Sequence, residues 1–85
     1  MSDPYSPYPM RQRFTIGTRV RVSALCAGWR FDANGTIRGG PEQVQTVQGE
    51  DYFYWVEVDT PQLDLSDDGP YDKAQILGRC LTIAA

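Results

Sequence analysis

Hydrophobic and polar residues alternate along the segment FTIGTRVRVSAL, which covers residues 14–25. In an extended chain one side would carry Thr18, Val20 and Val22. The opposite side would carry Arg19, Arg21 and Ser23. Because side chains alternate with a period of two along a strand, this pattern predicts a β-strand with one buried and one solvent-exposed face.

The segment DYFYWVEVD, residues 51–59, holds four consecutive aromatic residues, which one face of a strand cannot accommodate. We expect the side that ends in two valines to face the core, because burying the two acidic residues of the other side would require charged partners. The predicted core side carries Tyr52, Tyr54, Val56 and Val58. Phe53 and Trp55 therefore fall on the side that also carries Glu57 and Asp59.

The remaining pattern predicts further strands and turns. Residues 26–35 are expected to form a loop, with Asn34-Gly35 as a tight turn. Residues 36–48 are expected to form a strand interrupted at Gly39-Gly40-Pro41, which suits a bulge or bend. We expect a short turn at residues 49–51.

After residue 59, Pro61 is expected to end the strand, and residues 62–72 form an acidic loop. Residues 73–85 predict one or two short strands, with a short helical turn at residues 73–77 as an alternative. In this segment Leu81 and Ile83 would face one way, opposite Cys80 and Thr82.

No long helix is expected, so the predicted class is all-β with about five antiparallel strands. A small closed barrel would remove the edges that a flat sheet exposes. Residues 1–13 interleave three prolines with two tyrosines, which predicts an extended or disordered N-terminal arm. The β domain then covers residues 14–85.

The motifs GTRVRV, GTI, YWVEVD and AQILGRCLTI, in this order, resemble the strands of SH3-like small β-barrels. In size and layout the chain is similar to type II dihydrofolate reductase, whose opening strand is matched here by residues 17–21. The resemblance implies a pore-forming tetramer that binds NADPH and folate. Gln75 and Ile76 match that family's Val-Gln-Ile-Tyr stretch, and Leu77 stands in place of its tyrosine. The chain also looks like short bacterial proteins of mobile integron gene cassettes.

Composition excludes several kinds of chemistry. The chain of 85 residues is expected to form one domain, and it contains no histidine and two cysteines. Triads that depend on an imidazole are therefore excluded, and two cysteines cannot complete a zinc site. We expect both cysteines, Cys26 and Cys80, to stay reduced in a cytoplasmic protein, although a disulfide between them would close a long loop.

No stretch reaches the roughly 18 apolar residues of a membrane span. The first 13 residues lack the apolar core of a secretory signal, so a bacterial-type cytoplasmic location is expected. The net charge of −3 combines a basic first half with an acidic second half. This asymmetry indicates a basic face for an anionic ligand or self-complementary surfaces of an oligomer, unless folding mixes the two halves.

The stretch DLSDDG, residues 64–69, places oxygen ligands at the spacing of a calcium loop. The twelfth position is Gln75, however, where a calcium loop requires a bidentate glutamate. We therefore expect a solvated acidic turn and no bound metal or cofactor. The carboxylates of the chain show no pairing that indicates catalysis, so we expect no enzymatic activity.

Candidate binding residues remain. The large side chains of Phe53 and Trp55 on a charged face are typical of protein interfaces. The residues that could join them are Trp29, Phe31, Arg19 and Arg21. We expect a non-enzymatic binding or self-assembly module, which forms a homo-oligomer or binds a protein partner.

Three alternatives stay open. Loop or arm residues could cover Phe53 and Trp55 within one chain. The protein could be a reductase-like oligomer that binds a small molecule of unknown identity. Arginines beside aromatic residues could bind nucleic acid, although the estimated pI of 4.6 does not favour this.

Overall fold

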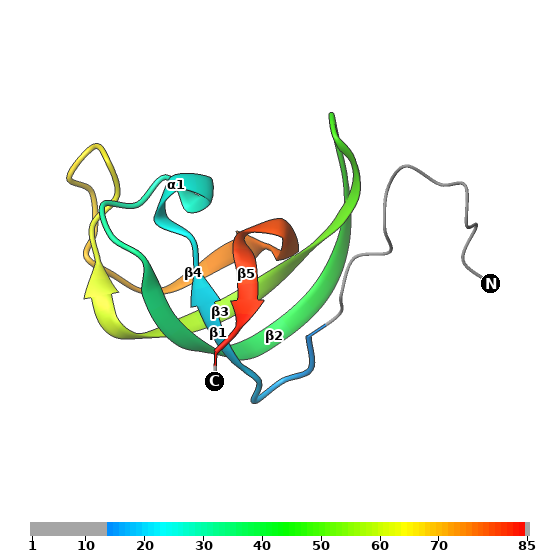
Figure 1. Cartoon of the computed structure of the whole chain (residues 1–85), viewed down its shortest axis with the longest axis horizontal. Coiled ribbons are helices and arrows are strands. Elements are labelled where there is room, and N and C mark those ends of the chain that lie inside the picture. Colours follow the sequence, from blue (N-terminus) through cyan, green and yellow to red (C-terminus); the bar gives the residue numbers. More distant parts are fainter. Residues whose placement is uncertain (1–13, 85) are drawn as a thin grey trace.

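The computed structural model describes residues 14–84 (Figure 1). The N-terminal arm expected at residues 1–13 lies outside the described residues. The strands are β1 (Arg19–Val22), β2 (Ala33–Thr46), β3 (Gly49–Gln62), β4 (Tyr71–Leu77) and β5 (Leu81–Ile83). Two short helical segments, α1 (Ala24–Ala27) and the 3₁₀ turn η1 (Gly78–Cys80), connect them. The predicted all-β class is confirmed.

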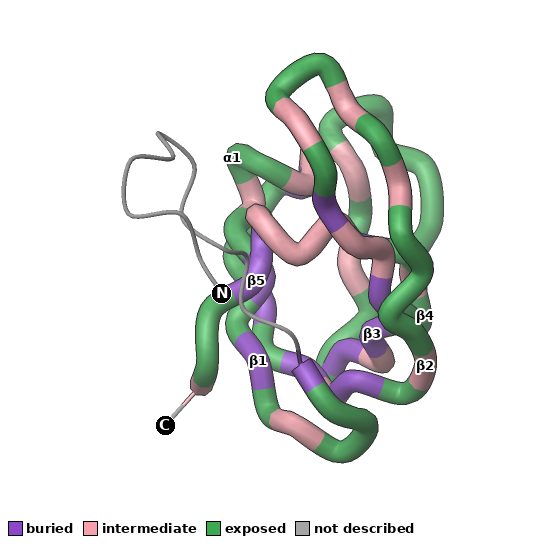
Figure 2. Tube along the Cα trace, turned by 90° about the vertical axis from the view of Figure 1, so that its right-hand side faces the viewer, coloured by how far each residue is buried: buried purple, intermediate pink, exposed green. Residues whose placement is uncertain are grey.

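The strands form one antiparallel sheet in the order β4-β3-β2-β1-β5. The first and last strands are neighbours, as Val22 pairs with Leu81. The sheet curves around an interior, and the buried positions of β1, β2 and β3 lie on the parts of the chain that surround it (Figure 2). The prediction of five antiparallel strands is therefore confirmed.

The alternation of the first and third strands places the core as expected at residues 20–22 and 54–58, but Tyr52 is only half-buried against that core. Val20 and Val22 of β1 and Val56 of β3 have no exposed surface, and Val58 is 7% exposed. Tyr54 is 1% exposed, and its ring packs edge-on against Phe14 with 5.4 Å between the ring centroids. The Tyr54 hydroxyl accepts a hydrogen bond of 3.0 Å from the Phe14 backbone N–H. A buried tyrosine generally needs such a partner for its hydroxyl group.

The predicted interruption of β2 is also confirmed. The pairing register with β3 shifts between Ile37 and Gly39 and again between Gly39 and Glu42. Gly40 has a φ of 95°, and a Cβ atom there would lie 2.6 Å from the Phe53 carbonyl oxygen. Only glycine tolerates both this backbone conformation and this close approach.

The predicted turn at Asn34-Gly35 is wrong. Both residues lie inside β2, where Gly35 pairs with Val20 on one side and Val58 on the other. A Cβ atom at Gly35 would lie 2.6 Å from the Glu57 carbonyl oxygen, so the glycine permits close strand packing instead of a turn.

The chain reverses earlier than expected, through α1. Ser23 caps this helix by accepting a hydrogen bond from the Cys26 backbone N–H. Gly28 ends it with a φ of 76°, and its N–H donates to the Ala24 carbonyl.

Three smaller predictions are corrected. The turn of the long hairpin lies at residues 47–48, so residues 49–51 already belong to β3. Pro61 does not end β3, which continues to Gln62. The alternative helical turn at residues 73–77 is wrong, because these residues pair with β3 as part of β4.

The expectation of two reduced thiols is wrong, because Cys26 of α1 and Cys80 of η1 form a disulfide with a Cα–Cα distance of 5.3 Å. The two cysteines are 54 residues apart in sequence, so the cross-link closes a long loop. In the chain-entropy model such a loop contributes about 4 kcal/mol to the free energy of unfolding. Within residues 14–84, no helix is long and apolar enough to cross a membrane.

Candidate interaction surface

Trp55 lies in the middle of β3 on the side that faces away from the core, and 46% of its surface is exposed. Its cross-strand neighbours are Gly39 of β2 and Gln75 of β4. A Cβ atom at Gly39 would lie 3.3 Å from the Cβ and Cδ1 atoms of Trp55, so the indole covers this glycine. Part of the ring therefore packs on the sheet, and the rest contacts solvent.

Polar and apolar side chains surround this tryptophan. Gln75 donates a hydrogen bond of 3.3 Å from Nε2 to Oε2 of Glu42. Phe53 is half-buried and lies between Glu42 and Leu77 in the sheet. We call the set Gly39, Glu42, Phe53, Trp55 and Gln75 the outer aromatic surface. An apolar centre with a polar rim is the usual anatomy of a protein interface.

The other two predicted aromatic residues do not join this surface. Trp29 is 5% exposed and belongs to the core, next to the end of α1. Phe31 is 71% exposed but precedes the first residue of β2, whereas Trp55 pairs with Gly39 farther along that strand. The sequence does not distinguish these aromatic residues, because both lie in a segment without alternation.

The predicted basic residues are paired within the chain. Arg19 donates to both carboxylate oxygens of Asp59, and Arg21 lies 3.3 Å from Asp32. The Arg19 guanidinium lowers the pKa of Asp59, chiefly by hydrogen bonding. Each of the five arginines in residues 14–84 makes such an ion pair. The pairs are Arg19–Asp59, Arg21–Asp32, Arg30–Asp67, Arg38–Glu57 and Arg79–Asp51.

Folding thus mixes the basic and acidic halves of the chain. Four of the five pairs have both side chains about half exposed, and ion pairs of this kind contribute little to stability. Their main consequence is that the described part of the chain presents no unpaired arginine stripe for a phosphate backbone.

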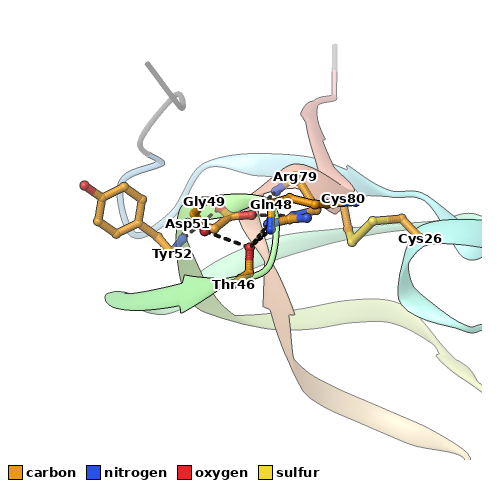
Figure 3. A network of polar contacts seen from close by, with 8 residues as sticks. All are labelled: Cys26, Thr46, Gln48, Gly49, Asp51, Tyr52, Arg79 and Cys80. Carbon is orange, nitrogen blue, oxygen red and sulfur yellow. Dashed lines mark hydrogen bonds and ion pairs between the residues drawn. A yellow bond between two sulfur atoms is a disulfide. The ribbon is translucent and has the colours of Figure 1, made fainter. Parts of the chain in front are cut away.

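The fifth pair is buried and lies at the hairpin end of β3 (Figure 3). Asp51 has no exposed surface, and the Arg79 side chain is 16% exposed. Arg79 donates from Nε to Oδ2 of Asp51 over 2.8 Å and from Nη2 to Oγ1 of Thr46 over 2.5 Å. The backbone N–H of Tyr52 donates to Oδ1 of Asp51 over 2.7 Å.

This network joins parts of the chain that are distant in sequence. Thr46 and Asp51 come from the two arms of the β2–β3 hairpin, and Arg79 comes from η1. The residue after Arg79 is Cys80, whose disulfide continues the connection to α1 (Figure 3). The hairpin alternation did not predict the burial of Asp51, because the residue that neutralises it follows 28 positions later.

The acidic loop uses its first aspartate to hold its own backbone. Oδ1 of Asp64 accepts hydrogen bonds from the N–H groups of Ser66, at 2.8 Å, and Asp68, at 3.0 Å. The Tyr71 hydroxyl donates to Oδ2 over 3.2 Å. These bonds, the one from Asp68 first, lower the pKa of Asp64. Among residues 14–84, no group of three or more His, Cys, Asp or Glu side chains could hold a metal ion.

A cleft of about 350 Å³ lies beside this loop. One wall is β4, and the other comprises residues 27–29 and residues 64–66. The cleft borders the outer aromatic surface, because Gln75 contributes to both.

No protein-family model, no curated protein and no solved structure matches this chain significantly.

Proposed function

We propose that the protein is a non-enzymatic binding or self-assembly module of the SH3-like barrel type, and that it contacts a second copy of itself through the outer aromatic surface. The observation that carries this proposal is the half-exposed indole of Trp55 in the middle of β3, opposite the bulge of β2. Tryptophan at the centre of a surface with a polar rim is the residue type that most often dominates binding energy.

The position of the outer aromatic surface supports self-association. It spans β2, β3 and β4, so it is held by the most extensively paired part of the sheet. A rigid surface loses little conformational entropy when it binds. Contact between two identical copies is the most common arrangement of soluble oligomers, and it needs one self-complementary surface.

The alternatives receive less support. Nucleic-acid binding would require cationic groups, but the arginines of the described residues are occupied by carboxylates. A reductase-like, small-molecule-binding oligomer and an origin in an integron cassette rest on the resemblance of the sequence motifs alone.

The cytoplasmic location stays a prediction. The Cys26–Cys80 cross-link is of a kind that persists in oxidising compartments and is rare in the cytosol. Alkylation of free thiols in intact cells, followed by mass spectrometry of the protein, distinguishes the two cases. Two alkylated cysteines would support the cytoplasm, and an intact disulfide would contradict it.

Sedimentation velocity over a wide range of protein concentration tests the proposed function. We expect the wild type to self-associate, and Trp55→Ala to weaken association at least about tenfold. Phe31→Ala is the matched control, because Phe31 is exposed but lies outside the outer aromatic surface. A wild type that stays monomeric, or equal weakening by the two substitutions, would overturn the proposal.

A further inference from the structure

The cleft beside the acidic loop exposes the edge of a strand. Three consecutive residues of β4, Ala74, Gln75 and Ile76, line it. Because successive side chains of a strand point to opposite faces, three neighbours can border one cleft only along the backbone edge. β4 is the last strand on its side of the sheet, so this edge has no neighbouring strand in the described structure.

An unpaired strand edge is a template for another extended chain. Its N–H and C=O groups can form a new ladder with a segment that lies in the cleft. The only charged residues of β4, Asp72 and Lys73, lie near its start, so the edge along residues 74–76 is free of charge. This part of β4 is therefore open to strand addition.

Apolar side chains form the floor and the rim of the cleft. Trp29 and Ile76 are almost completely buried beneath it, at 5% and 6% exposed. Leu65 and Tyr71 line it while keeping 69% and 37% of their surfaces exposed. Burial of these two side chains under a bound segment would contribute hydrophobic free energy.

The charge around the cleft selects the occupant. Asp64 lines the cleft, and Asp68 and Asp72 lie in the loop and strand that border it. Asp68 and Asp72 make no ion pair with the described residues, and Arg30 is already paired with Asp67. Lys73 of β4 also makes no ion pair with the described residues, but Asp64, Asp68 and Asp72 outnumber it, so the net negative charge near β4 complements a cationic segment.

We propose that the cleft binds an extended segment of a partner protein that alternates lysine or arginine with apolar residues, by adding it as a sixth strand next to β4. The bound segment pairs its backbone with residues 74–76. Its apolar side chains contact Leu65 and Tyr71, and its cationic side chains lie near Asp68 and Asp72. The site meets the outer aromatic surface at Gln75 but includes neither Trp55 nor Phe53, so the peptide experiment and the Trp55→Ala experiment test the two proposals separately.

The probe is a capped octapeptide of alternating lysine and valine with a fluorescent label. Fluorescence anisotropy measures its affinity, and NMR of the labelled protein locates the site. We expect binding at low salt, with the largest amide shifts at residues 74–76 and residues 64–66. Two comparison peptides separate the contribution of charge from that of backbone pairing. One replaces lysine by glutamate, and the other carries N-methyl groups on alternate residues and so cannot form one edge of a ladder.

Substitutions in the protein test whether its aspartates attract the cationic peptide. Asp68→Asn with Asp72→Asn preserves side-chain shape, and we expect it to weaken the lysine–valine peptide about tenfold. Glu50→Gln is the control, because it removes a charge at the distant hairpin, where Glu50 contacts Gln43. Leu65→Ala removes apolar contact at an exposed position, and it should weaken binding without lowering the melting temperature.

The proposal is supported if both comparison peptides lose affinity by about tenfold or more and the aspartate variants weaken binding while Glu50→Gln does not. It is overturned if N-methylation has no effect, if the glutamate peptide binds equally well, or if the NMR shifts map elsewhere. It is also overturned if a second copy of the protein occupies the β4 edge, which would protect residues 74–76 from hydrogen exchange only at high protein concentration.

Discussion

Asp51 and Trp55 lie on the same side of β3 by alternation, yet one is completely buried and the other is 46% exposed. Phe53, between them, is half-buried. The difference arises from η1, which packs over the hairpin end of the strand. A Cβ atom at Gly78 of η1 would lie 3.0 Å from Oδ1 of Asp51. Around Trp55, the contacts of the described residues come from the sheet itself, through Gly39 and Gln75.

The comparison shows that a strand face becomes core only where another element covers it. At Asp51 the cover also supplies the opposite charge, through Arg79, and the disulfide attaches that cover to α1. At Trp55 a large apolar side chain stays partly in contact with water. The Asp51 end of this face therefore stabilises the fold, and the Trp55 part is the surface that we propose for binding.

Among the substitutions that test this comparison, removal of the buried carboxylate should lower the free energy of unfolding most. Asp51→Ala would leave the Arg79 guanidinium without its buried partner, and we expect the free energy of unfolding to fall by about 3–5 kcal/mol. Urea unfolding monitored by circular dichroism measures this change. A loss below about 1 kcal/mol would show that the network does not hold η1 on the hairpin.

Removal of the cross-link should have the next largest effect. Cys26→Ser with Cys80→Ser should lower the free energy of unfolding by about 2–4 kcal/mol, since the unfolded chain regains the entropy of a long loop. Relative to the wild type, amide hydrogen exchange in this variant should accelerate more at residues 78–80 than at residues 53–57. Uniform acceleration across the sheet would mean that the disulfide has no special connection to η1.

Tyr54 lies on the opposite side of β3, and its substitution should lower the stability by an intermediate amount. Tyr54→Phe removes the hydroxyl that accepts the Phe14 N–H, and a buried unsatisfied N–H costs about 1–3 kcal/mol. Thermal unfolding of the variant measures the loss. Unchanged stability would indicate that the Phe14 N–H finds another acceptor.

The smallest expected effect on stability comes from the ion pair between Arg19 and Asp59, at the exposed end of the same face. The Arg19 guanidinium lowers the pKa of Asp59, so this pair adds stability above the unfolded pKa of the carboxyl and loses it as the pH falls through the folded pKa. Arg19→Gln should raise the pKa of Asp59 in an NMR titration, and added salt should reduce the difference. An unchanged pKa would mean that the exposed pair is not populated in solution.

The sequence predicted the regular part of this fold. Alternation identified Val20, Val22, Tyr54, Val56 and Val58 as core residues, and the glycine–proline cluster identified the bulge of β2. Alternation works there because residues 20–22 of β1 and residues 54–58 of β3 are covered on one side only.

Apart from the local corrections at residues 49–51, Pro61 and residues 73–77, the predictions that were wrong concern contacts between distant segments. Asn34-Gly35 resembles a local turn, but strand pairing on both sides places it within the sheet. The burial of Asp51 and Trp29 and the pairing of the cysteines depend on residues about 30 to 50 positions away. The local sequence pattern contains no information about partners that are so distant in sequence.

Concentration-dependent thermal unfolding of the wild type and Trp55→Ala tests the assignment of this face most directly. Stability of an oligomer increases with protein concentration, whereas that of a monomer does not. We expect the wild-type melting temperature to rise with concentration and that of Trp55→Ala to stay constant. At the lowest concentration the two should differ by no more than about 1 kcal/mol in stability, the usual value of a cross-strand contact. A variant that is several kcal/mol less stable at every concentration would place Trp55 in the core and contradict its proposed role in binding.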